Sequence, residues 1–203
     1  SHEALTAALR VHDEMRIELM AGQYLDVREA GEREHSVERS LRIARYKSGK
    51  YTIERPLHFG ASLGGASTNL ITAYTNYGVP LGQAFQLRDD MLGIFGDPVV
   101  TGKPTGDDLR EGKRTALMAV TMERASPVQL KELSRNFGDP NLTNQQVSTL
   151  QSIIVETGAQ AHIESMIEEL TNTSLSALTH DEISTVGKAL LTELADIATN
   201  RKI

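Results

Sequence analysis

The chain has 203 residues, a formal net charge of −6 and no cysteine. This length suits one domain with a sizeable core. The acidic balance argues against a nucleic-acid groove as the main function, although a locally basic pocket could still bind an anion. Without cysteine neither a disulfide nor a thiolate metal site can form, which fits a reducing, cytoplasmic setting. No run of about eighteen apolar residues occurs, so we expect no integral membrane segment.

Helical periodicity runs through the first third of the chain. Apolar residues over 5–20 recur mostly at three- and four-residue steps, and Gly22 interrupts this first helix without ending it. Ser36 is a suitable N-cap for a second helix. The next segment, over 51–63, contains Pro56, which we expect to kink or break it.

The rest of the chain also favours helices. Residues 66–95 predict one long helix or two stacked ones, because Gly78 and Pro80 fall in the middle. Residues 97–111 combine Pro, Gly and Asp without an apolar period, which predicts a loop. No stretch alternates in polarity, so the predicted fold class is all-α, and residues 1–203 form a single domain. The remaining predicted helices cover 115–125, 127–137, 143–157, 158–178 and 181–200.

Asp89 and Asp90 are adjacent carboxylates near the end of the long apolar helix. Such a pair resists burial unless a cation neutralises it. Mg²⁺ usually takes one or two carboxylates together with phosphate oxygens of a substrate. Gln86 lies one turn earlier on the same helical face. An isolated Asp-Asp pair usually lies in solvent on a helix surface. Here the apolar residues that precede the pair place it beside a core.

The segment that follows carries the charges that a polyphosphate site requires. Lys103 and Lys113 supply point charges for phosphate, and the glycines between them let the backbone approach a ligand. Asp108 can orient a lysine or a metal-bound water. Taken alone, this segment is equally consistent with a flexible polar connection.

Two earlier segments add polar side chains at helical spacing. KSGKYT presents Lys47, Ser48 and Tyr51 on a basic, hydroxyl-bearing face, although a solvated helix end is the simpler interpretation. A Walker phosphate loop is not supported, because its Gly and Ser/Thr positions are not met. Gln23 and Asp26, in GQYLD, share one helical face and form either a hydrogen-bonded core pair or part of a cavity.

Together GQYLD, KSGKYT, FQLRDD and GKPTGDDLREGKRT resemble, in this order, the motifs of the polyprenyl synthetase family. These are the trans-isoprenyl diphosphate synthases, which include geranylgeranyl and farnesyl diphosphate synthases. The resemblance is close from Gly22 to about Arg114 and loose beyond it. It implies an antiparallel helical bundle of the isoprenoid synthase type around a central cavity, and a homodimer. The implied reaction is a Mg²⁺-dependent condensation of an allylic diphosphate with isopentenyl diphosphate, with a product such as geranylgeranyl diphosphate.

The resemblance also implies roles for individual residues. The magnesium ligands would be Asp89, with Asp90 in support and Asp108 acting through a metal-bound water. The diphosphate-binding residues would be Lys47, Lys103, Lys113 and Gln86. The catalytic residues facing the allylic cation would be Lys47, Ser48 and Gln86. The remaining cavity residues would be Gln23, Asp26 and Tyr51.

The sequence departs from the family pattern in three places. Position 93 is Gly where the second aspartate-rich motif usually ends in Asp, and Asp97 could recover part of that charge if the helix continues so far. Ser48 replaces the usual Thr and keeps the hydroxyl. The first aspartate-rich motif is absent. We therefore expect this chain to be a C-terminal portion that lacks the N-terminal helices and is inactive alone.

Three alternatives stay open at this stage. A non-catalytic regulatory or partner subunit of a prenyl diphosphate synthase would have little reason to keep a polyphosphate site. A terpene cyclase on the same fold is disfavoured by the lysine-bearing segment GKPTGDDLREGK. A helical scaffold with incidental acids does not explain four motifs in family order.

Overall fold

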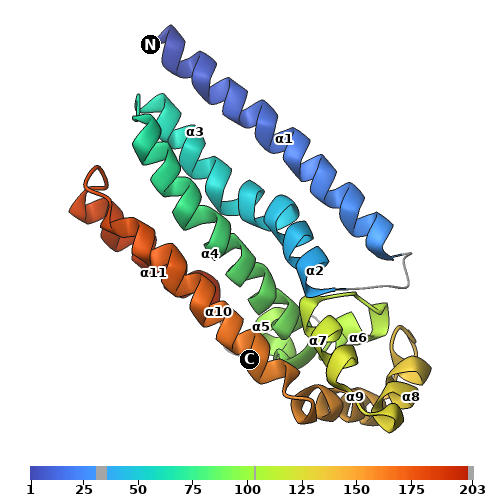
Figure 1. Cartoon of the computed structure of the whole chain (residues 1–203). Coiled ribbons are helices and arrows are strands. Elements are labelled where there is room, and N and C mark those ends of the chain that lie inside the picture. The colour runs from blue at the N-terminus through green and yellow to red at the C-terminus, as the bar shows by residue number, and fades with distance from the viewer. Residues whose placement is uncertain (31–35, 103, 201–203) are drawn as a thin grey trace.

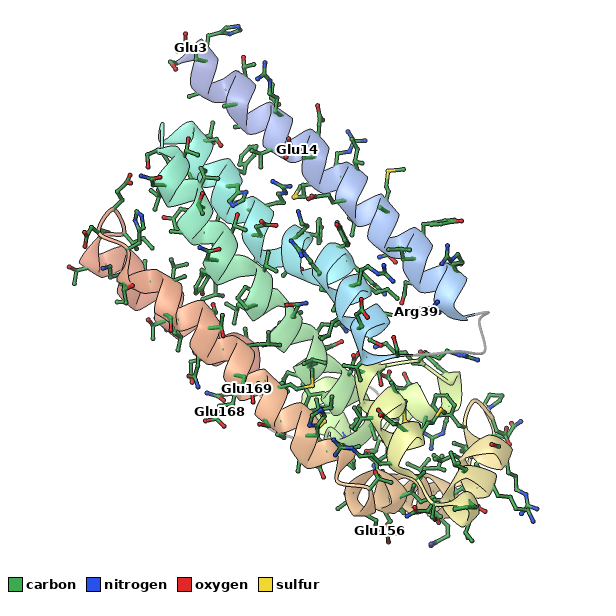
Figure 2. The ribbon with its side chains drawn as sticks, in the orientation of Figure 1. Glu3, Glu14, Arg39, Glu156, Glu168 and Glu169 are labelled. Atoms are coloured by element: carbon green, nitrogen blue, oxygen red, sulfur yellow. The ribbon has the colours of Figure 1, made fainter. Side chains whose placement is uncertain are left out.

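The computed structural model describes residues 1–30, 36–102 and 104–200, and in these ranges it contains helices and no strand (Figure 1). The longest elements lie side by side and alternate in direction: α1 (His2–Ala30), the continuous α2–η1–α3 rod, α4 (Thr68–Phe95) and α10 (Ala159–Ser176). The rod comprises α2 (Val37–Ala44), η1 (Arg45–Glu54) and α3 (Arg55–Leu63). The predicted all-α, antiparallel bundle is confirmed.

The shorter helices gather at one end of the bundle (Figure 1). At the end of the chain, η2 (Ala177–Thr179) leads into α11 (Thr185–Thr199), which packs against α4 and α10. The short helices are α5 (Pro98–Thr101), α6 (Asp107–Glu111), α7 (Ala116–Arg124), α8 (Pro127–Asn136) and α9 (Asn144–Glu156).

Several helix boundaries follow directly from capping chemistry. Ser36 accepts a hydrogen bond from the Arg39 N–H and starts α2, as predicted. Thr143 starts α9 with a capping box. Residues 68–95 form one helix rather than two, with Pro80 inside it. The last helix begins at Thr185, four residues later than predicted, because Ser184 caps it.

Two predictions about local structure are wrong. Pro56 does not break its helix, because it lies in the first turn of α3, directly after the π-helical turns of η1. The segment 97–111 is not a plain loop, because it forms α5 and α6. The Asp97 side chain accepts a hydrogen bond from the Val99 N–H (2.8 Å) and caps α5. Because α4 ends at Phe95, Asp97 does not extend the acidic face of that helix.

Glycines bring η1 into direct backbone contact with its two neighbours. A Cβ on Gly82 of α4 would stand 2.0 Å from the Gly49 Cα of η1, and one on Gly78 would stand 2.8 Å from the Glu54 Cα. On the other side, a Cβ on Gly22 of α1 would lie 2.6 Å from the Lys47 nitrogen. The π-helical segment is therefore held between α1 and α4 without side chains as spacers.

The apolar core divides along α4. The first half of α4 packs Tyr77 and Leu81 against α11, and the second half packs Met91 and Ile94 against helices α7, α9 and α10. Between them, buried Arg88 donates two hydrogen bonds to the Glu164 carboxylate (2.7 and 2.6 Å) and one to the Thr199 carbonyl (2.7 Å). These bonds fix α4 against α10 and α11. Among the described residues, no helix has the length and apolar character needed to cross a bilayer.

A charged cluster joins α1 to the rod. Arg55 binds the Glu18 carboxylate (2.7 Å) and pairs with Glu14 (3.2 Å). Lys50 bridges Glu18 and the buried Glu54. These contacts link the first helix to the residues that follow KSGKYT.

His58 lies against this cluster and should make the fold acid-sensitive. It is buried and contacts the Thr75 hydroxyl of α4 (3.0 Å) and the Arg55 guanidinium (3.4 Å). Burial lowers the pKa of His58, Glu54 opposes this shift, and Arg55 and Lys50 reinforce it. The unfolded chain therefore binds the proton more readily, so stability is lost as pH falls below about 6.5.

We expect His58→Gln to reduce this loss between pH 7.5 and 5.5, by at most about 1.4 kcal/mol per pH unit. Urea unfolding at several pH values measures it. Equal pH dependence in the variant and the parent would contradict the assignment.

Candidate active site

A cavity of about 410 Å³ opens where α1, α2, η1 and α4 meet the α6–α7 segment. Five of its lining residues come from the predicted site. Asp26, Lys47, Gln86 and Asp90 lie on three separate helices, and Lys113 lies in the turn before α7. A larger cavity of about 970 Å³ shares Arg114 with it but is lined by none of the predicted site residues.

A chain of hydrogen bonds runs along one side of the smaller cavity. The Ser48 hydroxyl donates to the Gln86 side-chain oxygen, and the Gln86 amide donates to Asp90 (3.0 Å). Lys113 donates to Asp90 (3.0 Å) and to Asp108 (3.2 Å). Residues far apart in the sequence therefore form one connected polar group.

Local backbone geometry explains how Lys113 reaches this position. Gly112 ends α6 in the left-handed region (φ 66°), and the Lys113 N–H then donates to the Asp108 carbonyl (2.9 Å). The turn folds the lysine back over the helix that carries Asp108. Elsewhere in the cavity lining, Lys47 binds Asp26 (2.7 Å), next to the close contact of α1 and η1 at Gly22.

The cluster of Asp90, Asp108 and Lys113 carries more negative than positive charge. Burial raises the pKa of Asp90 to about 6, against the opposing influence of Lys113 and Gln86. Burial alone would lower the pKa of Lys113, but the carboxylates of Asp90 and Asp108 raise it above its ordinary value. The lysine is thus held as a cation, and one carboxylate remains for a further positive charge.

The donor chemistry of this cluster fits a magnesium ion. Asp90 lines the cavity, Asp108 is joined to it through Lys113, and the two residues, 6% and 4% exposed, offer hard oxygen donors. Among the described residues no three His, Cys, Asp or Glu side chains converge as a complete protein cage. Mg²⁺ needs no such cage, because it commonly uses one or two carboxylates and completes its shell with phosphate oxygens and water.

The structure brings most of the predicted residues together but leaves some apart. Asp26, Lys47, Ser48, Gln86, Asp90, Asp108 and Lys113 line the cavity or bind a residue that lines it. Gln23, Tyr51 and Asp89 are exposed and are not among the lining residues, and the Tyr51 side chain is 45% exposed. Lys103 lies outside the described residues.

Sequence reasoning missed two contributors to this site. Arg114 lines the cavity next to Lys113, and its position directly after the lysine of the GKRT segment was the available signal. Gly93, noted only as a missing acid, adjoins the Asp108 carboxylate: a Cβ at position 93 would stand 2.3 Å from the Asp108 Oδ2.

The helical bundle and its lysine–carboxylate cavity define the class of protein. The profile of the polyprenyl synthetase family matches residues 1–156, and the chain belongs to this family. A geranylgeranyl pyrophosphate synthase from Corynebacterium glutamicum, solved with isoprenyl diphosphate and magnesium, is 41% identical with a TM-score of 0.95. That match covers 100% of this chain and 57% of the other chain.

Sequence relatives carry similar names. A geranylfarnesyl diphosphate synthase of Aeropyrum pernix is 34% identical over 165 residues, which cover 81% of this chain and 50% of that protein. A (2E,6E)-farnesyl diphosphate synthase of Mycobacterium bovis is 38% identical over 109 residues, covering 54% and 30%. The chain thus spans about half the length of the relatives it matches.

Proposed function

We propose that the complete protein condenses isopentenyl diphosphate with an allylic diphosphate to give a longer polyprenyl diphosphate. The observation that carries this proposal is the connected group of Ser48, Gln86, Asp90, Lys113 and Asp108 beside a cavity in a polyprenyl synthetase. A geranylgeranyl-type product is favoured by the names of the similar solved structures.

The lysines and carboxylates of the site could stabilise a diphosphate as a leaving group. Lys47 and Lys113 both line the cavity and can bind diphosphate oxygens, and Lys103 would add a third cation. Asp89, Asp90 and Asp108 would hold magnesium, which neutralises charge on the leaving diphosphate when it is bound. A leaving group whose charge is neutralised separates at a lower barrier.

Oxygen dipoles from the α2–η1–α3 rod and from α4 could stabilise the allylic cation that is left when the diphosphate departs. Ser48 and Gln86 bring a hydroxyl and an amide oxygen together, and Gln86 and Lys47, the residue before Ser48, line the cavity. Such dipoles stabilise positive charge without adding a nucleophile that would end the reaction. Asp26, which lines the cavity, would contribute to the rest of the chamber; Gln23 and Tyr51, proposed for the same chamber, are exposed and do not line the cavity in this chain. In the complete protein we also propose a cytoplasmic homodimer.

The test is an assay of the complete gene product. We would incubate it with labelled isopentenyl diphosphate, Mg²⁺ and dimethylallyl, geranyl or farnesyl diphosphate, then identify the products by chromatography. Elongation that EDTA abolishes and Mg²⁺ restores would support the proposal. Failure with every primer, together with stimulation of an active homologue, would instead support the partner-subunit alternative.

A further inference from the structure

Gly93 is the unusual feature of the site, because it stands on the face of α4 that carries the acidic pair. It follows Asp90 by three residues, so the two positions are neighbours on the helix surface. A glycine near the end of a helix interior normally costs stability relative to alanine. Its presence therefore calls for a reason of packing or function.

The atoms nearest to a Cβ at position 93 belong to a single side chain. A Cβ at position 93 would lie 2.3, 2.4 and 2.7 Å from the Oδ2, Cγ and Oδ1 atoms of Asp108. All three nearest atoms belong to one carboxylate, which approaches from α6. The clashing atoms are the end of a side chain that could only relieve the contact by turning, and Asp108 is buried, with 4% of its surface exposed.

The Asp108 carboxylate is held there by the same lysine that binds Asp90. Lys113 Nζ lies 3.2 Å from the Asp108 Oδ2 and 3.0 Å from the Asp90 Oδ1. The oxygen that contacts the lysine is also the one nearest to a Cβ at position 93. Any side chain at position 93 would thus displace the carboxylate from its bond to Lys113.

We propose that Gly93 is a positioning residue: its missing side chain gives the Asp108 carboxylate the place from which it and Asp90 aim the Lys113 ammonium into the cavity. The Asp108 carboxylate of α6 then stands next to position 93, where the family's motif usually has an acid of its own. This inference rests on the proposed function, since the ammonium matters through the diphosphate that it binds.

The first test needs no ligand. Gly93→Ala, Asp108→Ala and the double variant are made in the complete gene product, and urea unfolding midpoints form a double-mutant cycle. We expect Gly93→Ala to lower the midpoint when Asp108 is present and to raise it when residue 108 is Ala. Gly60→Ala is the matched control, because a Cβ there meets nothing within 4 Å and should only stabilise the helix. A raised midpoint in both backgrounds would overturn the proposal.

The second test separates positioning from packing. Affinity for Mn²⁺ and inorganic pyrophosphate is measured by calorimetry and electron spin resonance. We expect Gly93→Ala and Asp108→Ala each to weaken binding by about tenfold or more, with no further loss in the double variant. Wild-type affinity in Gly93→Ala would overturn the proposal.

A variant that does not fold and a parent protein that is inactive also give clear answers. If Gly93→Ala does not fold, recovery of folding in the double variant supports the pairing, and continued failure overturns it. If the parent protein binds no pyrophosphate and extends no primer, the proposed function fails. The unfolding cycle still decides whether Gly93 and Asp108 form a matched pair.

Discussion

Gly82→Ala should separate two helices and disable the site in one step. The new methyl group would stand 2.0 Å from the Gly49 Cα and 2.9 Å from its carbonyl carbon, and these are backbone atoms that cannot rotate away. Overpacking of this kind costs about 3 kcal/mol or more, which exceeds the gain of about 1 kcal/mol from replacing a helical glycine. Moving η1 away from α4 would also break the bond between Ser48 and Gln86.

The partner glycine supplies the control. A Cβ on Gly49 would lie 3.4 Å from the Gly82 Cα, which is an ordinary contact. Gly49→Ala should therefore fold normally, although it touches the same interface. Thermal and urea unfolding of both variants measure the difference. Similar stability of the two would show that the contact between η1 and α4 is looser than described.

The helices of this fold could be predicted from sequence because their signals are local. Ser36 and Thr143 are capping residues, and apolar residues at helical spacing identify α1 and α4. Pro56 misled the prediction because a proline's effect depends on the hydrogen-bond pattern around it, and the π-helical turns of η1 are not visible in a sequence. Asp97 could have replaced the missing charge only if α4 continued to it, and the sequence did not show that this acid instead caps α5.

The site was predictable in composition but not in arrangement. Lys113, Asp90 and Gln86 were identified from residue type and motif order, and the cavity contains them. Their hydrogen-bond partners depend on the contact of α4 with η1 and α6, which no local pattern encodes. Gly93 shows this most clearly, since its role depends on a carboxylate fifteen residues later in the chain.

Asp90→Asn should stabilise the protein and remove most of its activity. The rise of the Asp90 pKa from its ordinary 3.8 to about 6 corresponds to about 3 kcal/mol spent on keeping this buried carboxyl ionised in the folded state. Asparagine has nearly the same shape and no charge, and Lys113 retains Asp108 as its partner. We therefore expect the free energy of unfolding at neutral pH to rise by about 1–3 kcal/mol.

Prenyl transfer by the complete protein should fall by about a hundredfold or more, because an uncharged amide neutralises neither a divalent cation nor the lysine beside it. Asp181→Asn, at an exposed position outside the cavity, is the matched control and should change neither quantity appreciably. Unfolding curves and initial rates on the same preparations give both values. A variant that is less stable and fully active would mean that Asp90 serves the fold through Lys113 and not the reaction. Opposite signs in the two measurements would show that the protein keeps a destabilising charge because the diphosphate site requires it.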